Sequence, residues 1–386
     1  MSVEVRPLGV RCNLSCAYCY QNPQRDAGNL KRPYSVDSMI AAAERQGSNF
    51  TVFGGEPLLI PLRDLEQLWA FGHKRYGKNG IQTNGTLISS EHVAAFEKYN
   101  VHVGFSIDGP EELNGLRTSV DVRRTAELTR VSIGWLETLT RARRVGTSLI
   151  FTLHRANAVG DRLGRLLEWL VFLDALGLKS ARVHLLESEN EAVRKLYGLS
   201  TRENIAALRA IASLEKRCRT LRLDLFRDIR QLLLAKDQSA TCVWNACDPL
   251  TTAAVQGIEG DGSSSNCGRT NKEGVDWVKA PAPGFERSLA LWNTPQKFGG
   301  CSGCRWFLFC KGQCPGTSLE QDWRNRSEHC DVWRDAFEQE EKRLLSNAQR
   351  PISDNPFLRK RLEFRLVDAW LRRSNLSIAR AHTGRC

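Results

Sequence analysis

Short apolar runs alternate with longer amphipathic segments through the first half of the chain. Strand-like runs are predicted at residues 3–8, 49–53, 79–84, 102–107, 147–153 and 181–186. Helical periodicity lies between them, at 36–47, 62–75, 90–99, 122–144 and 162–177. Ser35 and Ser90 stand at the expected N-cap positions of two of these helices. Regular alternation of strand and helix predicts parallel β/α units. Six such units predict an α/β fold with an open, partial (β/α)6 barrel rather than a closed barrel of eight strands.

The second half of the chain changes character twice. After a barrel expected over residues 1–190, residues 191–240 form a charged, helical bridge. Residues 241–335 are rich in Cys, Gly and Asn and lack periodicity, which is typical of a small domain organised by metal. Residues 336–386 return to helix, and the apolar positions from Phe357 to Leu371 predict a face that packs on the rest of the protein.

The composition is that of a soluble globular protein, with 41% hydrophobic and 25% charged residues among 386. No apolar run is long enough to span a membrane, and the N-terminus lacks a secretory signal, so a cytoplasmic protein is expected. Thirteen cysteines in that setting favour metal over disulfides. The net charge of +12 suits an acidic peptide, nucleic acid or simple solubility. Nucleic-acid binding is not expected, because no recognition-helix or stacking signature is present.

The most specific motif near the N-terminus is Cys12-x3-Cys16-x2-Cys19. Three thiolates at this spacing can hold three irons of a [4Fe–4S] cluster and leave the fourth iron open for a small ligand. A zinc site is the alternative for the same cysteines. Zinc would not explain the sequence Gly54-Gly55-Glu56-Pro57, which follows the second predicted strand.

Further polar residues follow the next predicted strands. Asn84 ends the third strand, Ser106 and Asp108 end the fourth, and Arg117 lies downstream. Taken singly, these are ordinary turn residues and a solvated arginine. Together they fall at the carboxyl ends of parallel strands, where such folds bind their ligands.

A second set of cysteines occupies the C-terminal half. Cys301-x2-Cys304-x5-Cys310-x3-Cys314-x15-Cys330 is preceded by Cys242, Cys247 and Cys267. By itself, Cys301-x2-Cys304 suits zinc as well as iron–sulfur. Cys218 lies in a helical stretch and Cys386 is terminal, and both are expected to be structural or incidental rather than ligands.

In combination, these motifs resemble the radical S-adenosylmethionine (radical SAM) enzymes, specifically the subgroup with a C-terminal SPASM domain. The resemblance runs from Val3 to about Cys330. It implies S-adenosylmethionine as cofactor and three [4Fe–4S] clusters. The radical SAM cluster would use Cys12, Cys16 and Cys19. The two auxiliary clusters would use interleaved sets of cysteines. The ligands of the first would be Cys242, Cys247, Cys267 and Cys314, and those of the second would be Cys301, Cys304, Cys310 and Cys330.

The resemblance also implies roles in the cofactor pocket. Tyr18 matches the aromatic position near adenine, and Gly54, Gly55 and Glu56 match the motif that holds the methionine ammonium. Positions lining the pocket and contacting the ribose are matched by Asn84, Ser106 and Asp108. Arg117 resembles an arginine that pairs with the methionine carboxylate, a task suited to a fork donor.

Members of this subgroup mostly modify peptides, so we expect a 5′-deoxyadenosyl radical to abstract hydrogen from a ribosomally made precursor peptide. Net oxidation through the auxiliary clusters would leave an intramolecular crosslink. The expected partners are that peptide and an electron donor such as flavodoxin or ferredoxin. No separate leader-binding domain is visible before the first strand, so leader recognition is expected to need a separate leader-binding protein, or the basic bridge and tail. No catalytic side chain is assigned beyond the cluster.

Two alternatives remain open. One is a protein-modifying oxidase such as a sulfatase-maturing enzyme. Those relatives carry an aspartate that acts as a base beside the third cysteine of the first auxiliary cluster. Here, Gly268-Arg269-Thr270 follows Cys267 instead. The other is a non-catalytic iron–sulfur electron carrier, which would have no need of the glycine-glycine-glutamate motif.

Overall fold

A computed structural model describes residues 2–26, 33–118, 121–188, 190–248, 255–270 and 284–384. The chain divides into two compact units. The barrel unit comprises Ser2–Asp224 and Gln256–Asp276, and the cysteine-rich unit comprises Leu225–Val255 and Trp277–Cys386. The boundaries expected from the sequence, at residues 190, 240 and 335, stay predictions.

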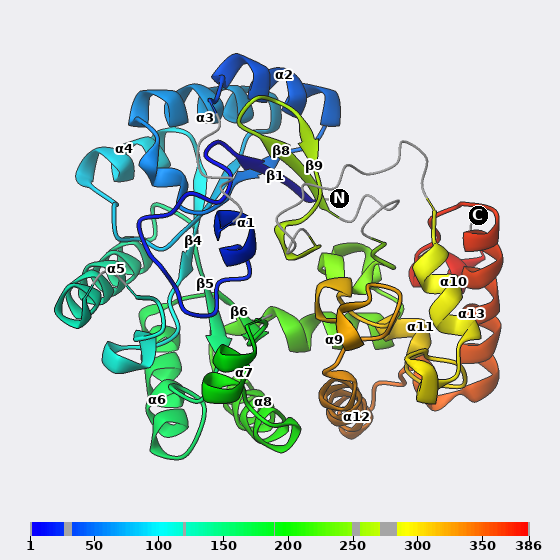
Figure 1. Cartoon of the computed structure of the whole chain (residues 1–386). Coiled ribbons are helices and arrows are strands. Elements are labelled where there is room, and N and C mark those ends of the chain that lie inside the picture. The colour runs from blue at the N-terminus through cyan, green and yellow to red at the C-terminus, as the bar shows by residue number, and fades with distance from the viewer. Residues whose placement is uncertain are drawn as a thin grey trace. The chain divides into compact units, whose positions relative to one another are not determined.

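The barrel unit is built on one nine-stranded sheet, in the order β7-β6-β5-β4-β3-β2-β1-β8-β9 (Figure 1). Consecutive strands from β1 to β7 pair in parallel, and β8 and β9 form an antiparallel hairpin. The strands are β1 (Ser2–Arg6), β2 (Phe50–Val52), β3 (Asn79–Thr83), β4 (Val101–Ser106), β5 (Thr147–Leu153), β6 (Ser180–Leu185), β7 (Arg222–Leu223), β8 (Val255–Glu259) and β9 (Ser264–Ser265). Because the order has two ends, the sheet is open, and the predicted partial barrel is confirmed.

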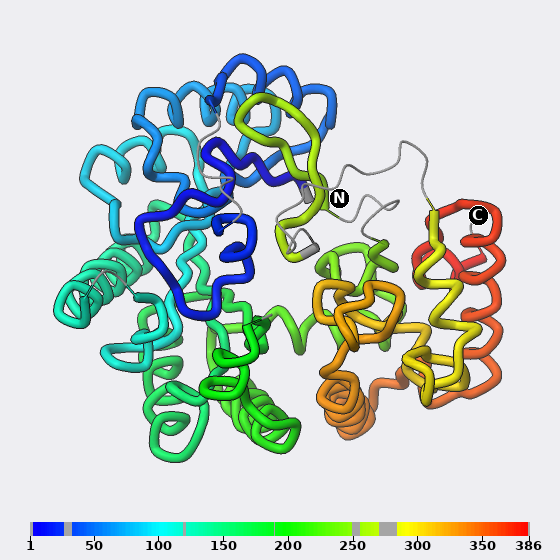
Figure 2. Tube along the Cα trace, viewed as in Figure 1, coloured from blue at the N-terminus to red at the C-terminus, as the bar shows by residue number. Residues whose placement is uncertain are grey.

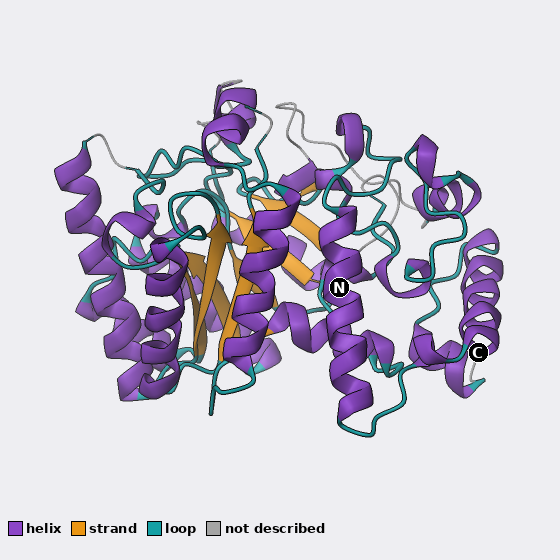
Figure 3. Cartoon of the chain, turned by 90° about the horizontal axis from the view of Figure 1, so that it is seen from below, coloured by secondary structure: helices purple, strands orange, loops and turns teal. Residues whose placement is uncertain are grey.

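Helices connect the parallel strands, and the longer ones cover the outside of the sheet (Figures 1 and 3). They are α1 (Asn22–Asp26), α2 (Val36–Gln46), α3 (Leu62–Tyr76), α4 (Ser90–Lys98), α5 (Val122–Ala142), α6 (Asp161–Leu176), α7 (Glu191–Tyr197) and α8 (Thr201–Glu215). Ser35 caps α2 as predicted, by accepting from the Ser38 N–H. The cap of α4 is Ser89 rather than Ser90, because Ser89 keeps extended backbone angles while Ser90 is already helical.

Three short strands were not predicted. Arg222–Leu223 lies in a stretch expected to be helical, yet it pairs with β6. The hairpin β8–β9 comes from the cysteine-rich sequence and lies beside β1 (Figure 2). β7 and β9 have only two residues each, too few to show any periodicity, and β8 lies in a cysteine-rich sequence that lacks the regular alternation of the barrel.

The two faces of the parallel strands differ in chemistry. The apolar residues of β1 and β6 are buried. Glu4 and Arg6 share the opposite face of β1, and Arg182 and His184 share that of β6, because side chains alternate along a strand. This charged face suits a polar ligand better than a packed core.

The cysteine-rich unit is mainly helical. It contains α9 (Asp224–Leu233), α10 (Glu286–Asn293), α11 (Phe307–Cys310), α12 (Cys330–Ser346), α13 (Pro356–Leu371) and α14 (Ile378–Thr383). Aromatic rings form much of its core: the Phe337 ring stacks on Trp306 at 5.4 Å and meets the edge of Trp244 at 5.5 Å.

The apolar face predicted for residues 357–371 is only partly buried. Leu362, Val367 and Trp370 pack inside the unit. Phe357 and Leu371 are 89% and 66% exposed, so their inclusion in a packed face was wrong. They share one exposed stripe of α13 with Phe364, which is 60% exposed, because residues seven apart lie on the same side of a helix.

Among the described residues, no helix is both long enough and apolar enough to cross a membrane.

Candidate functional site

The loop after β1 brings Cys12, Cys16 and Cys19 together. The Cys19 N–H donates to the Cys16 carbonyl at 3.1 Å, and the Leu14 N–H donates to the Cys12 sulfur at 3.4 Å. Burial, reinforced by the neighbouring thiols, raises the pKa of Cys12 to about 11 and that of Cys16 to about 12. Because iron binds thiolates, a bound metal cluster is what would keep these sulfurs ionised near neutral pH. The donor set therefore fits a cluster with one open iron.

Asp108, which follows β4, organises the floor of this site. Its carboxylate accepts hydrogen bonds from the Tyr18 hydroxyl, from the Thr152 N–H at 2.8 Å and from Arg117 at 3.1 Å, and it lies 3.3 Å from the His154 ring. Burial alone would raise the pKa of Asp108, but Arg117, His154 and Tyr18 hold it well below its usual range. Both carboxylate oxygens are thus occupied within the protein, and the predicted contact with ribose stays a prediction.

Arg117 lies between this carboxylate and the cysteines. Its guanidinium carbon is 5.6 Å from the centre of the Tyr18 ring, and its charge acts on the Cys16 thiol. The Nε–H is buried and has no hydrogen-bond partner among the described residues. A buried N–H left over beside a cluster loop fits the carboxylate of a bound ligand.

Gly54 and Gly55 allow the cysteine loop to approach the end of β2. A Cβ atom on Gly55 would lie 2.0 Å from the Arg11 carbonyl oxygen, and one on Gly54 would lie 2.6 Å from that of Gly9. The Gly55 and Glu56 N–H groups donate to these two carbonyls, each at 2.9 Å. Glycine at both positions therefore allows the backbone of the cysteine loop to approach closely.

The Glu56 carboxylate ties this turn to the end of β3. It accepts from the Leu58 N–H at 3.1 Å, the Thr83 hydroxyl at 2.7 Å and the Asn84 N–H at 2.8 Å. Burial raises the pKa of Glu56 to about 7, although these hydrogen bonds act in the opposite direction. Its predicted contact with the methionine ammonium stays a prediction.

The remaining predicted pocket residues lie at neighbouring strand ends. The Asn84 side chain donates to the Asn13 side chain at 2.9 Å and lies 3.9 Å from the Cys12 sulfur. Ser106 accepts a hydrogen bond of 2.8 Å from Gln82. The structure therefore places Asn84 against the cysteine loop, whereas Ser106 is engaged on the sheet.

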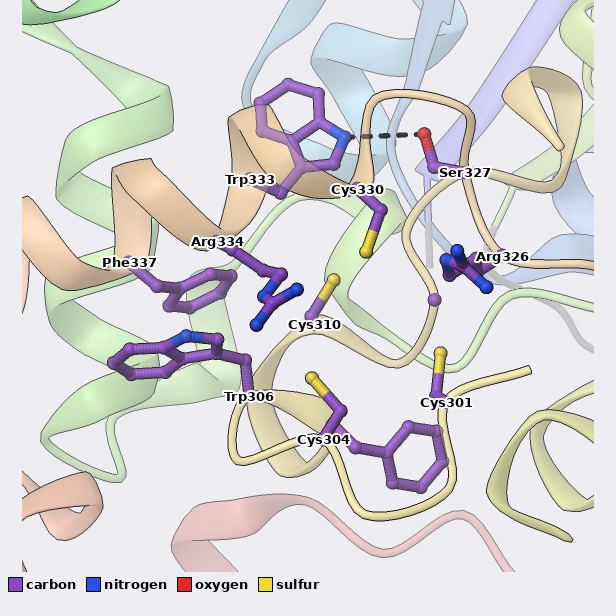
Figure 4. A pocket seen from close by; sticks show the side chains of 12 residues that line it. Cys301, Cys304, Trp306, Cys310, Arg326, Ser327, Cys330, Trp333, Arg334 and Phe337 are labelled. Carbon is purple, nitrogen blue, oxygen red and sulfur yellow. Dashed lines mark hydrogen bonds between the residues drawn. The ribbon is translucent and has the colours of Figure 1, made fainter. Parts of the chain in front are cut away.

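A pocket in the cysteine-rich unit gathers one of the predicted cluster sets (Figure 4). The four cysteines and two of the aromatic rings that line it are Cys301, Cys304, Cys310, Cys330, Trp306 and Phe337. The Trp333 ring N–H donates to Ser327 at 3.4 Å and closes another wall. Burial raises the pKa of Cys301 to about 12. Four cysteines around one largely apolar pocket fit a four-thiolate cluster.

The other predicted set is distributed over both units. Cys242, Cys247 and Cys314 belong to the cysteine-rich unit, and Cys267 belongs to the barrel unit. Their common ligation of a cluster stays a prediction. In the described part of the chain, no three His, Cys, Asp or Glu side chains converge on a position for a single metal ion.

Gly268, next to Cys267, lies in a packed surrounding. A Cβ atom there would come within 3.0 Å of the Tyr20 ring and 3.3 Å of the Arg6 guanidinium. Arg6 itself is buried and paired with Glu259. Arg269 forms an ion pair with Glu187. The carboxylates near this segment, Glu259 and Glu187, are thus each paired with an arginine, and neither stands at the position next to Cys267.

Sequence reasoning missed His154 and Arg6. His154 follows β5 as Asp108 follows β4, so the rule that ligand-binding residues lie at strand ends could have found it. Arg6 is the last residue of β1, but its partner Glu259 is 253 positions away, and nothing local indicates that pair.

Comparisons with known proteins agree with this geometry. Residues 7–157 match the family described as the Radical SAM superfamily. The Cysteine-type anaerobic sulfatase-maturating enzyme of Clostridium perfringens strain 13 is 32% identical over 149 residues, which are 33% of this chain and 40% of that protein. The Serine-type anaerobic sulfatase-maturating enzyme of Bacteroides thetaiotaomicron is 36% identical over 127 residues, 29% of this chain and 30% of that protein. The chain thus spans well under half the length of these relatives.

Solved structures extend the likeness of fold over most of the chain. The enzyme anSMEcpe with bound AdoMet and Cp18Cys peptide has 22% identity and a TM-score of 0.63, covering 90% of this chain and 98% of that one. Streptococcus suis SuiB bound to its precursor peptide SuiA has 16% identity and a TM-score of 0.55, covering 85% and 75%.

Proposed function

Because residues 7–157 belong to the radical SAM superfamily, we propose that this protein uses S-adenosylmethionine and a [4Fe–4S] cluster on Cys12, Cys16 and Cys19 to modify a peptide or protein. When bound, such a cluster supplies the electron that cleaves the cofactor to a 5′-deoxyadenosyl radical. The observation that carries the proposal is the Nε–H of Arg117, which is buried near Cys16 and has no hydrogen-bond partner among the described residues.

The chain's own residues have distinct tasks in this site. Arg117 binds the methionine carboxylate through its free N–H, and Asp108 fixes both Arg117 and the Tyr18 ring. Gly54 and Gly55 hold the cysteine loop against β2. With both oxygens of Asp108 engaged, the residue positions its neighbours rather than exchanging protons.

We assign two auxiliary clusters to the remaining cysteines. Cys301, Cys304, Cys310 and Cys330 would hold one of them in their shared pocket. The other would use Cys242, Cys247, Cys267 and Cys314. Clusters of this kind supply one-electron redox chemistry, which an overall oxidation of the peptide requires.

The leading candidate reaction is an intramolecular crosslink in a ribosomally made precursor peptide. The fold shared with SuiB, whose structure was solved with a precursor peptide, supports this choice. An electron donor such as flavodoxin or ferredoxin and a separate leader-binding protein would complete the system.

The second candidate is oxidation of a protein residue, as in sulfatase maturation. The similarity of 32–36% to sulfatase-maturating enzymes favours it. Gly268 argues against it, because the position after Cys267 carries no carboxylate and an added Cβ there would come within 3.0 Å of the Tyr20 ring and 3.3 Å of Arg6.

Anaerobically reconstituted full-length protein tests the proposal. With dithionite and S-adenosylmethionine, chromatography and mass spectrometry should detect 5′-deoxyadenosine, and the triple change of Cys12, Cys16 and Cys19 to Ala should abolish it. The change Cys218→Ser provides a matched control that keeps activity. The absence of 5′-deoxyadenosine from iron-loaded wild type, with a peptide present, would contradict the proposal.

Two peptides separate the candidate reactions. A precursor encoded beside the gene should lose two hydrogen atoms and acquire a crosslink visible in fragmentation spectra. The Cp18Cys peptide seen with anSMEcpe should remain unchanged. Conversion of its cysteine to an aldehyde would establish the second candidate instead.

A further inference from the structure

Arg287, the second residue of α10, is completely buried in the cysteine-rich unit. Its guanidinium donates five hydrogen bonds to backbone carbonyls, those of Trp323 at 2.5 Å, Lys311 at 3.4 Å, Gln313 at 3.0 Å, Gly312 at 3.2 Å and Asn325 at 3.0 Å. The Asp248 carboxylate accepts from the backbone N–H of Arg287, not from its guanidinium. The side-chain N–H groups of Arg287 therefore donate to uncharged carbonyl oxygens.

Three of these carbonyls belong to the turn that joins Cys310 to Cys314. The φ angles of Lys311, Gly312 and Gln313 are +50°, +76° and +61°. Left-handed backbone is unfavourable for lysine and glutamine, so this turn persists only if other contacts stabilise it. Arg287 supplies such contacts, because the three consecutive carbonyls all accept from its guanidinium.

The turn has a special place in the proposed cluster arrangement. Cys310 belongs to the set in the shared pocket, and Cys314 belongs to the other set. The turn therefore carries the chain from one proposed cluster to the next. A shift of its backbone would move a ligand of each.

The charge of Arg287 also requires an explanation. A buried cation without a counter-ion is strongly disfavoured. Among the described residues, the ionisable groups that act most strongly on the Arg287 guanidinium are the thiols of four cysteines, Cys247, Cys314, Cys301 and Cys310. These represent both proposed ligand sets. A four-thiolate cluster carries a charge of roughly −2, so bound clusters would supply the missing negative charge.

We propose that Arg287 is a positioning residue for both auxiliary clusters, which holds the Cys310–Cys314 turn in shape and places one buried positive charge between the two ligand sets. The inference rests on the two auxiliary clusters of the proposed function. It predicts two separable effects of Arg287, one on cluster assembly and one on reduction potential.

The test uses full-length Arg287→Gln and Arg287→Lys, reconstituted anaerobically beside wild type. Iron and sulfide per chain report assembly, and redox titrations followed by electron paramagnetic resonance report the potentials. Arg287→Gln should lose up to about eight of about twelve irons, and any auxiliary cluster that remains should have a lower potential. Arg287→Lys keeps the charge but not the five donors, so it should lose iron while its remaining clusters stay near the wild-type potential.

A matched control is Arg359→Gln, which removes a mostly buried arginine of the same unit that is paired with Glu363. It should change neither iron content nor potentials. Formation of 5′-deoxyadenosine by all variants separates this inference from the proposed function, because the cluster of Cys12, Cys16 and Cys19 lies in the other unit.

If the wild-type protein binds no more than about four irons per chain, it has no auxiliary clusters, and Arg287 cannot position them. Full iron with unchanged potentials in Arg287→Gln would overturn the inference directly. If circular dichroism shows that Arg287→Gln is unfolded, Arg287→Lys decides, and its full iron content would likewise overturn the positioning role.

Discussion

The carboxylate of Asp108 lies 3.1 Å from the guanidinium of Arg117, with the two side chains 0% and 11% exposed. The same carboxylate accepts a hydrogen bond from the Tyr18 hydroxyl, so one buried anion fixes the positions of both Arg117 and Tyr18. A buried pair of this kind stabilises the fold only while both partners remain.

Asp108→Asn should therefore destabilise the protein substantially. The amide would leave Arg117 as an uncompensated buried charge, which costs about 3–5 kcal/mol in comparable cases. Urea unfolding of the iron-free protein measures the effect. Arg124→Gln, which breaks the exposed ion pair with Glu127, is the control and should produce a far smaller change. Equal losses in the two variants would mean that the buried pair has no special role.

Gly55→Ala should disrupt the cysteine loop. The new Cβ would stand 2.0 Å from the Arg11 carbonyl oxygen, and a backbone atom cannot move aside without shifting the loop. We expect loss of about four irons of about twelve and of 5′-deoxyadenosine formation. Gly134→Ala is the control, because nothing lies within 4 Å of its added methyl group within α5. That variant should be as stable as wild type or slightly more so.

Glu56 should make the stability of the iron-free protein depend on pH. Burial raises the pKa of Glu56 to about 7 from its ordinary 4.5, so the folded state holds the proton more tightly than the unfolded chain. Its contribution is fully present below about pH 4.5 and is lost as pH rises through about 7, by at most about 3 kcal/mol.

Unfolding midpoints at about pH 5 and about pH 7.5 measure this contribution. Glu56→Gln should be less stable at both values, since an amide cannot accept all three hydrogen bonds, but its midpoint should vary less with pH. An unchanged pH dependence in the variant would assign the effect to another group.

Cys330→Ala should remove one ligand of the pocket in the cysteine-rich unit. Loss of one thiolate from a four-thiolate cluster should lower the iron content by up to about four atoms per chain. Cys218→Ser in the barrel unit should leave the iron content unchanged. The two variants together decide whether this pocket is an iron–sulfur site, because a protein whose iron content is insensitive to Cys330 cannot use it as a ligand.

The local pattern of apolar and polar residues was sufficient to predict the order of strands and helices in the barrel unit. Alternating strands and helices predicted the six β/α units, and their expected bounds differ by only a few residues from β1 to β6. The caps show the limit of this reasoning. Ser35 was found, but Ser89 and Ser90 are equally good caps by residue type, and only the backbone angles distinguish them.

The residues of the candidate site could likewise be predicted only in part. Spacing indicated Cys12, Cys16 and Cys19, because three thiolates in this motif can hold three irons of one cluster. The engagement of Glu56 with Thr83, and of Asp108 with His154, could not be read from spacing, because it depends on which strand ends meet.

By itself, the sequence determined the β/α order and the open barrel, since these follow from short-range periodicity, and its cysteine motifs predicted the cluster sites. Only the tertiary structure showed what Arg6 and Arg287 contact. Their partners come from distant parts of the chain, such as the Arg6–Glu259 pair at a separation of 253 residues. A buried charge must be compensated by whatever the fold brings beside it, and no local pattern records that neighbour.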